Sequence, residues 1–229
     1  MTEPQAPALH TTGLTKTYDE LVALHPLDLV VPAGQSVALI GHNGSGKSTL
    51  LRMVAGLLDP SEGDIEVAGF ELGEVEARAT TSFLPDDPVL YDDLSLREHV
   101  EYISRLHGGE GWDDYAEGLC HRLGLEERID DLPARFSRGL RQKTSIVLAL
   151  VRPFSLLLVD EPFVGLDQPG KAVLLELLDE VHADGAATMV ATHDPAYVDR
   201  VDRSLALRDG EVIFDGTASV EQVLHLVGG

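Results

Sequence analysis

The chain has 229 residues and carries 39 Asp and Glu against 17 Lys and Arg, for a formal charge of −22. So acidic a chain is a poor candidate for sequence-independent binding to nucleic acid or anionic lipid, because both depend on clustered Lys and Arg. Apolar residues make up 44% of the chain, which is enough for a core, and the single cysteine, Cys120, excludes an internal disulfide and fits a reducing cytoplasm.

The first part of the chain predicts short strands around one helix. Turn residues such as Pro32-Ala33-Gly34 separate the strands, and one strand is apolar enough to be fully buried. In chain order we predict strands at Leu27–Val31 and Ser36–Ile40, a helix at Ser48–Leu58, and strands at Asp64–Ala68 and Thr81–Leu84.

The middle, about residues 92–152, is predicted to be mostly helical. Ser95 and Glu98 have the spacing of a capping box, and the helix that they open runs to about His107. Strands and helices then alternate again, which indicates an α/β sheet with a helical insertion. The predicted elements are strand Leu156–Val159, helix Lys171–Ala183, strand Ala187–Thr192, a helix capped by Asp194-Pro195, and a hairpin of Ser204–Leu207 and Glu211–Phe214 around Asp209-Gly210.

No segment of the sequence predicts a membrane span or an export signal. The longest strongly apolar stretch, Ile146–Val159, is interrupted by Arg152 and Pro153 and falls short of the ~20 residues that a span needs. The start, Met1–Leu9, has no basic residue and is not a signal peptide. We therefore expect no direct membrane insertion, and any work at a membrane would go through a partner.

One loop predicts a phosphate-binding site. Gly41–Ser48 fits the pattern G-x-x-x-x-G-K-[ST] at every fixed position and lies between a predicted strand and a predicted helix. Glycines let several backbone N–H groups point at one anion, and the helix adds its positive end. Lys47 would reach the β and γ phosphates and Ser48 would offer a hydroxyl to Mg²⁺. The candidate nucleotide ligands are Gly41, Asn43, Gly44, Ser45, Gly46, Lys47, Ser48 and Thr49.

Two acids end the apolar strand Leu156–Val159. Ligands bind at the carboxyl ends of such strands, so Asp160 would hold Mg²⁺, directly or through water. Glu161 would polarise the attacking water, which is the base that phosphoryl transfer needs. A strand end with two chance acids is the alternative in so acidic a chain, and the phosphate loop argues against it.

The segment between these motifs indicates a family. Phe136-Ser137-Arg138-Gly139-Leu140 resembles the signature of ABC transporter ATPases, usually written LSGGQ, in the looser form of many exporter ATPases. Ser137 and Gly139 match, while Phe136, Arg138 and Leu140 depart from the commonest letters. Other positions follow in the family's order, so the resemblance covers essentially the whole chain, from about Leu9 to Phe214.

The resemblance assigns roles to three further residues, each of which also has a simpler reading. Tyr18 resembles the aromatic residue that stacks on adenine, or it is an ordinary strand tyrosine. Asp167 resembles the loop that crosses the dimer, or it only caps the next helix. His193 resembles the switch histidine at the γ-phosphate, or it is a solvated loop residue. Ser137 can cap its helix and offer the same helix end to a phosphate.

Asp86 departs from the family pattern, which usually has Gln at this position to reach the metal and the attacking water. A carboxylate can still ligate Mg²⁺, but it adds negative charge beside the γ-phosphate. The hypothesis is that Asp86 keeps the sensing role with altered metal affinity, while its loop contacts the membrane partner.

The resemblance implies an α/β fold with a P-loop NTPase (RecA-like) core, an N-terminal antiparallel β subdomain and an inserted helical subdomain. The whole of 1–229 would be one ABC ATPase domain, with the core and β subdomain at about 1–91 and 153–229 and the helical signature subdomain at about 92–152. The function implied is an ATP-hydrolysing transporter subunit, preferably of an exporter. It would form a homodimer or heterodimer of ATPase subunits around ATP and Mg²⁺.

Each ATP would lie between Gly41–Thr49 of one subunit and Ser137–Leu140 of the other. The protein would bind a transmembrane permease subunit at the inner face of the cell membrane and would otherwise be cytoplasmic. Two other function classes stay open: a non-transport ABC ATPase, and a regulator that binds nucleotide without turnover. The single phosphate loop and the acidic charge argue against the first, and Glu161 and His193 argue against the second.

The distribution of charge agrees with a nucleotide site. No Asp or Glu occurs within 29–58 or within 132–159, and these two windows carry formal charges of +2 and +5. They contain the two motifs that would face each other across ATP. The acidic residues therefore surround two locally positive segments, and two such subunits should repel each other at low salt.

Overall fold

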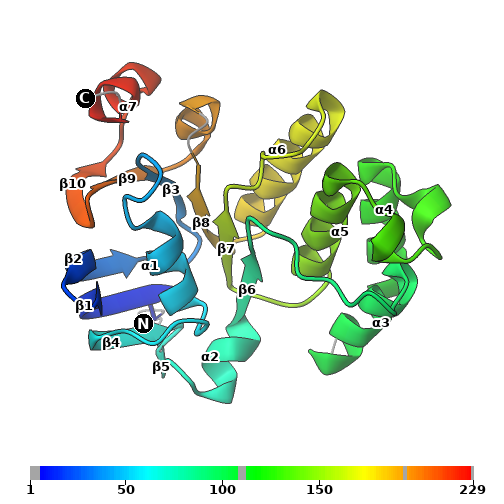
Figure 1. Cartoon of the computed structure of the whole chain (residues 1–229), viewed down its shortest axis with the longest axis horizontal. Coiled ribbons are helices and arrows are strands. Elements are labelled where there is room, and N and C mark those ends of the chain that lie inside the picture. Colours follow the sequence, from blue (N-terminus) through cyan, green and yellow to red (C-terminus); the bar gives the residue numbers. More distant parts are fainter. Residues whose placement is uncertain (1–5, 108–111, 193–194, 228–229) are drawn as a thin grey trace, which may run out of the picture.

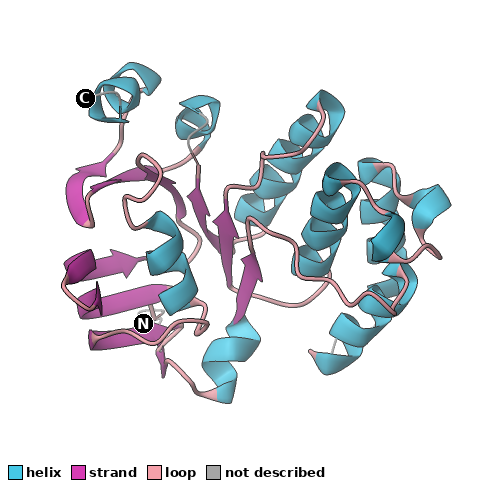
Figure 2. Cartoon of the chain, in the orientation of Figure 1, coloured by secondary structure: helices cyan, strands magenta, loops and turns pink. Residues whose placement is uncertain are grey.

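The protein is described from a computed structural model, which describes residues 6–107, 112–192 and 195–227. It contains two sheets and a separate group of helices (Figures 1 and 2). The smaller sheet is antiparallel, with strand order β2-β1-β4-β5. Its strands are β1 (Leu9–Tyr18), β2 (Leu21–Val31), β4 (Glu62–Val67) and β5 (Phe70–Glu71).

The larger sheet has the strand order β10-β9-β3-β8-β7-β6. Its strands run parallel except for β10, which pairs antiparallel with β9 in the hairpin expected around Asp209-Gly210. The carboxyl ends of the parallel strands therefore meet at one edge, where α/β folds bind their ligands. The strands are β3 (Ser36–Ile40), β6 (Thr81–Leu84), β7 (Leu156–Asp160), β8 (Ala187–Ala191), β9 (Arg203–Arg208) and β10 (Glu211–Gly216).

The two faces of the larger sheet pack into different cores, as the alternation of side chains along a strand requires. On β7, Leu156 and Leu158 join the core shared with the smaller sheet and α1 (Lys47–Val54). Leu157 and Val159 join the core on the other face, with α6 (Gln168–Ala183) and the helical group. Helix α1 is thus held between the two sheets, which fixes the loop that precedes it.

The helical group stands at one end of the molecule (Figure 2). Its first helix begins with the expected capping box, because the Ser95 N–H donates to Glu98 Oε2 at 2.7 Å and the Glu98 N–H donates to Ser95 Oγ at 3.3 Å. Cys120 lies in its core, and burial raises the pKa of the thiol to about 11. The helices are α3 (Leu96–Leu106), α4 (Trp112–Leu123), the 3₁₀ turns η1 (Glu126–Arg128) and η2 (Pro133–Arg135), and α5 (Arg138–Leu150).

The remaining helices flank the sheets. They are α2 (Val75–Thr80), the 3₁₀ helix η3 (Pro195–Arg200) and α7 (Val220–Val227). Among the described residues, no helix combines the length and the apolar character that crossing a bilayer requires.

Several expected boundaries were wrong. The helix predicted at Ser48–Leu58 ends at Val54, because Gly56 adopts a positive φ of 70° and stops it. The helix predicted to begin at Lys171 begins at Gln168, with Pro169 in its first turn. The helix expected after Asp194-Pro195 is a 3₁₀ helix that begins at Pro195, and Asp194 lies outside the described residues.

Candidate functional site

The loop between β3 and α1 has the close backbone packing that its glycines allow. Gly46 immediately precedes α1 with φ 104°, a left-handed conformation that other residues rarely adopt. A Cβ atom there would lie 2.8 Å from the carbonyl oxygen of Ala23 on β2. A Cβ at Gly41 would collide with the Ser45 side chain and the Leu207 carbonyl. The glycines therefore let the loop curl tightly against β2 and β9.

Lys47 lies inside this loop. Its side chain is 5% exposed, and its Nζ donates to the carbonyl oxygens of Gly41 at 2.8 Å and His42 at 3.2 Å. Glu161 Oε1 lies 3.6 Å from the same Nζ. The lysine thus brings a positive charge to a glycine-rich loop at the start of a helix, a kind of loop whose backbone N–H groups can bind an anion.

A hydroxyl and a carboxylate meet next to this lysine. Ser48 Oγ donates to Asp160 Oδ1 at 3.0 Å, joining the start of α1 to the end of β7. Burial raises the pKa of Asp160, while the Ser48 hydrogen bond and Arg52 act in the opposite direction. A buried carboxylate beside a hydroxyl suits a hard cation, so the two residues fit Mg²⁺.

Ser48 and Asp160 alone do not fill the coordination shell of Mg²⁺, so phosphate oxygens would have to complete it. The described ranges contain no group of three or more His, Cys, Asp or Glu side chains that could hold a metal ion. Magnesium ions in nucleotide sites are held by one or two protein ligands plus the substrate's phosphates, so Ser48 and Asp160 are a sufficient protein share.

Glu161 adopts an unusual backbone conformation directly after β7. Its φ is 44°, which costs a non-glycine residue of the order of 1–3 kcal/mol and which is typical of active sites. Its N–H donates to the Ala191 carbonyl at the end of β8 at 2.9 Å. The side chain is 14% exposed and turned toward Lys47. The backbone thus holds this carboxylate at the same edge as Asp160.

Asp86 lies two residues after β6, which pairs in parallel with β7. It is half-buried, and its negative charge contributes to raising the pKa of Asp160. Asp86 therefore lies near enough to Asp160 for its charge to act on that carboxyl.

The signature segment begins α5. Ser137 is the N-cap, and its Oγ accepts from the Leu140 N–H at 3.3 Å. A Cβ at Gly139 would lie 2.9 Å from the Gly165 carbonyl, so only glycine allows this approach. The two segments line a cavity of about 290 Å³. Its lining residues are Ser137, Gly139, Leu140, Lys143, Gly165 and Asp167.

The sequence left two roles open for Asp167, a loop that crosses the dimer and a helix cap. The structure shows the simpler one, because Asp167 is the N-cap of α6. Its Oδ1 accepts from the Gly170 N–H at 3.0 Å. Lys143 Nζ lies 3.2 Å from the same carboxylate and holds its pKa below the usual range. Sequence reasoning missed Lys143 as a site residue, although it stands one turn after Gly139 on the same face of α5.

Of the two remaining candidates, Tyr18 and His193, the structure describes only Tyr18. Tyr18 ends β1 with its side chain 46% exposed, and Lys16 Nζ lies 5.0 Å from the centre of its ring. The ring is therefore accessible for stacking. His193 lies outside the described residues.

The two motif regions do not form one site within a single chain. Figure 1 shows α1 and α5 on opposite sides of β6 and β7. One chain thus presents a phosphate loop with its acids at one place and a small cavity at the start of α5 at another.

Comparison with known proteins gives one family. The family model described as ABC transporter matches residues 24–164, more than half of the chain. The chain is 36% identical over 216 residues to the ABC-type transporter ATP-binding protein EcsA of Bacillus subtilis (strain 168), covering 92% of this chain and 87% of that protein. It is 36% identical over 221 residues to the macrolide export ATP-binding/permease protein MacB of Rhodopseudomonas palustris (strain BisB18). That match covers 90% of this chain but only 34% of MacB.

Solved structures agree. An ATP-binding subunit of an ABC transporter superposes with a TM-score of 0.89 at 33% identity, covering 96% of this chain and 99% of that one. The dimeric ATP-binding cassette MJ0796 in a post-hydrolysis state, bound to ADP and Pi, has a TM-score of 0.82 at 25% identity. It covers 91% of this chain and 98% of that one. Both likenesses confirm the predicted P-loop NTPase fold.

Proposed function

The chain belongs to the family of ABC transporter ATP-binding proteins, and on that premise we propose how its residues bind ATP, hydrolyse it and act on a membrane partner. It is an ATP-hydrolysing subunit of a transporter. The observation that carries the site assignment is the convergence of Lys47, Ser48, Asp160 and Glu161 at one edge of the larger sheet.

In the nucleotide site, the backbone of Gly41–Thr49 wraps the phosphates and Lys47 neutralises the β and γ groups. Ser48 and Asp160 would hold Mg²⁺, which offsets phosphate charge when it is bound. Glu161 accepts a proton from the attacking water, and the γ-phosphate contact is proposed for His193, which lies outside the described residues, from the family resemblance alone. Tyr18 stacks on the adenine. The geometry of the loop, the buried lysine and the strained Glu161 support the roles of Gly41–Thr49, Lys47 and Glu161.

Changing Asp86 to Ala should alter the dependence of ATPase activity on Mg²⁺. We expect several-fold more Mg²⁺ to be needed for half-maximal rate, because one carboxylate next to Asp160 is lost. A Mg²⁺ titration of phosphate release measures this, with Asp87→Ala, an exposed neighbour, as the control. An unchanged rate together with an unchanged Mg²⁺ curve would contradict the role of Asp86.

The proposed assembly is a head-to-tail dimer of this subunit or of this and a second ATPase subunit. Each ATP lies between Gly41–Thr49 of one subunit and Ser137–Leu140 of the other. Two observations support it: the separation of α1 and α5 within one chain, and the dimeric state of MJ0796. Asp167 caps α6 in the same cavity that presents Ser137 to the partner's phosphates.

Dimerisation in ATP should strengthen as ionic strength rises. Each subunit carries a formal charge of −22, so two subunits repel each other, and salt screens this repulsion beyond a Debye length of ~10 Å at 0.1 M. Sedimentation of the Glu161→Gln protein in ATP from about 50 to 500 mM salt would measure the effect. A steady fall in dimer affinity over that range would contradict the prediction.

The permease docks on the helical side of the molecule. The segment from Asp86 to Tyr91 presents Val89, which is 87% exposed, and Tyr91, whose ring packs edge-on against Tyr102 of α3. Buried His99 fixes the end of this segment, because its Nε2 accepts from the Tyr91 N–H at 2.9 Å and its Nδ1 donates to the Ser95 carbonyl at 2.8 Å.

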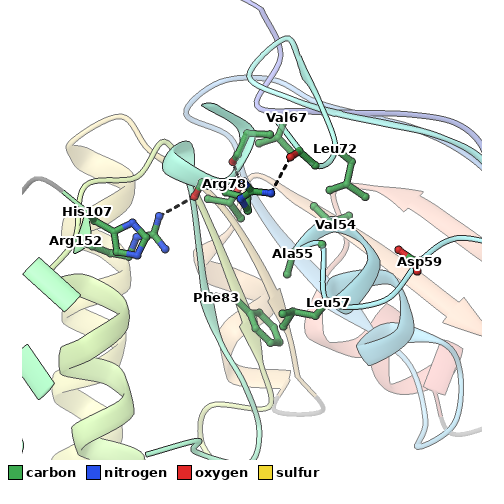
Figure 3. Close-up of a pocket in the computed structure, with 14 residues that line it drawn as sticks. Val54, Ala55, Leu57, Asp59, Val67, Leu72, Arg78, Phe83, His107 and Arg152 are labelled. Atoms are coloured by element: carbon green, nitrogen blue, oxygen red, sulfur yellow. Dashed lines mark hydrogen bonds between the residues drawn. The ribbon is translucent and has the colours of Figure 1, made fainter. Parts of the chain in front are cut away.

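A groove of about 450 Å³ lies between the end of α1, α2 and the helical region (Figure 3). Apolar side chains such as Leu57 and Phe83 line most of it, while Arg152 and His107 lie at one end. The Arg152 guanidinium donates to the carbonyls of Arg78 and Ala79 but makes no ion pair within the described ranges, and burial lowers its pKa. We propose that this groove binds a short segment of the permease. That segment would have apolar side chains and a carboxylate that pairs with the Arg152 guanidinium.

The proposed function is tested by isolating the tagged subunit from its native membranes and measuring phosphate release with and without the co-purified membrane protein. The transporter assignment expects a multi-span protein that changes the ATPase rate. Turnover in a preparation from which no membrane protein ever co-purifies would favour a non-transport ATPase, and nucleotide binding without turnover would favour a regulator.

The same co-purification experiment also tests whether the groove binds the permease. Leu57 is 66% exposed, so Leu57→Asp should fold and keep its basal ATPase rate, yet about tenfold less permease should co-purify with it. Val30→Asp is the control, since Val30 is an exposed apolar residue of β2 outside the groove. Equal recovery of the permease with both variants would overturn the groove assignment.

The proposal also includes three finer assignments. Export is the proposed direction of transport, supported by MacB, a macrolide export protein. The proposed subdomains are the core with its β part at about 1–91 and 153–229, and the helical part at about 92–152. The proposed location is the inner face of the membrane, reached through the permease.

A further inference from the structure

Two residues of this chain depart from the family pattern in ways that change charge. Asp86 stands where Gln is usual, which adds a negative charge. Arg138 stands at the first glycine of the LSGGQ pattern, which adds a positive charge. They belong to the two halves of the proposed composite site, one beside the metal-binding acids and the other beside Ser137.

The phosphate-loop half is rich in acids that must lie close to a polyanion. Asp86, Asp160 and Glu161 share one sheet edge, where the cations acting on them are Lys47, 3.6 Å from Glu161, and Arg52, which acts on Asp160. Within the described ranges, Asp86 makes no ion pair. Its carboxylate therefore adds a repulsion against the γ-phosphate that no ion pair among the described residues offsets.

The signature half carries a cation that makes no ion pair among the described residues. Arg138 is the first residue of α5 and is exposed. Its side-chain stem packs over Gly165, where a Cβ would lie 3.4–3.5 Å from the arginine's Cγ, Cδ and Nε. The nearby acid, Asp167, is paired with Lys143 at 3.2 Å. Across the described residues the Arg138 guanidinium makes no ion pair, so its charge is held beside the cavity of Ser137 without being neutralised there.

From this we propose that Arg138 of one subunit offsets the Asp86 carboxylate of the partner subunit across the shared nucleotide. The inference rests on the proposed head-to-tail dimer, in which the Ser137–Leu140 segment faces the partner's phosphate loop. Arg138 is then a nucleotide-contacting residue of the composite site, and the two departures from the family pattern depend on each other. A subunit with Asp86 needs the arginine more than a subunit with Gln would.

A double-mutant cycle tests this dependence. The variants Arg138→Gly, Asp86→Gln and the double variant are compared in the Glu161→Gln background, by the ATP concentration that gives half-maximal dimer in sedimentation. We expect Arg138→Gly to raise that concentration about tenfold, but no more than about twofold when Asp86→Gln is present. Equal effects of Arg138→Gly in both backgrounds would overturn the inference.

Control variants separate the effect of the Arg138 charge from the effect of its packing. The outcomes also distinguish a failure of this inference from a failure of the proposed dimer. Arg135→Gln removes an exposed arginine just before the signature, and it should leave the concentration unchanged. Arg138→Lys should retain most of the wild-type affinity, because it keeps the charge. If the Glu161→Gln protein fails to dimerise in ATP at all, the head-to-tail dimer itself fails. If it dimerises and the two substitutions act additively, only the dependence between Arg138 and Asp86 fails.

Discussion

Glu161→Gln should leave ATP bound and the dimer closed while hydrolysis slows ~10²-fold or more. The amide keeps the size of the side chain and the backbone bond from the Glu161 N–H to the Ala191 carbonyl, so the strained φ of 44° is preserved. It loses the base that accepts a proton from the attacking water. Removing a negative charge 3.6 Å from Lys47 also frees that lysine for the phosphates, so ATP affinity should rise or stay equal.

Single-turnover phosphate release and equilibrium ATP binding, measured on the same preparation, separate these two effects. Glu127→Gln is a matched control, because Glu127 is an exposed acid of η1 in the helical region. The control should hydrolyse ATP at the wild-type rate. Wild-type turnover in Glu161→Gln itself would remove Glu161 from the catalytic role and leave the nucleotide site without its base.

The site was predictable from sequence where one local pattern fixes both backbone and chemistry. The loop Gly41–Ser48 requires its glycines for steric reasons that hold in any fold, as the contact at Gly46 with the Ala23 carbonyl illustrates. The strand Leu156–Val159 was predicted because burial on both faces demands a continuous apolar run. The capping box at Ser95 is equally local.

Elements with weak local signals were missed. The sequence reading did not predict β1, where Gly13 and a run of threonines interrupt the alternation and the pairing with β2 shifts register. Helix α2 has six residues and is held by packing against β4 and β6 rather than by a capping side chain. Such elements depend on partners distant in sequence, which periodicity within one segment does not report.

Contacts between motifs also could not be predicted from the sequence. The approach of Gly139 to the Gly165 carbonyl and the pairing of Lys143 with Asp167 join segments more than twenty residues apart. The sequence left Asp167 as either a dimer residue or a helix cap. The structure shows that the cap is present and that the same carboxylate lines the signature cavity, so the two readings do not exclude each other.

Lys47→Ala should weaken ATP binding ~10–100-fold, because hydrogen bonds from a charged donor contribute about 1.5–3 kcal/mol. The lysine is 5% exposed, and its loss also leaves the carbonyls of Gly41 and His42 without their donor. Calorimetric titration with ATP measures the affinity, and thermal unfolding checks that the loop change has not cost the fold. Lys47→Met, which keeps the stem without the charge, should bind ATP as weakly. Wild-type affinity in either variant would contradict the role of the lysine.

Lys47 acts on two kinds of negative charge, and a second substitution separates them. Without the lysine, the Glu161 carboxylate that lay 3.6 Å from its Nζ stays beside the phosphates and repels them. Adding Glu161→Gln to Lys47→Ala should therefore restore part of the lost ATP affinity, about threefold to tenfold, without restoring hydrolysis. If the double variant binds ATP no better than Lys47→Ala alone, the lysine serves the phosphates only and the contact with Glu161 has no part in nucleotide affinity.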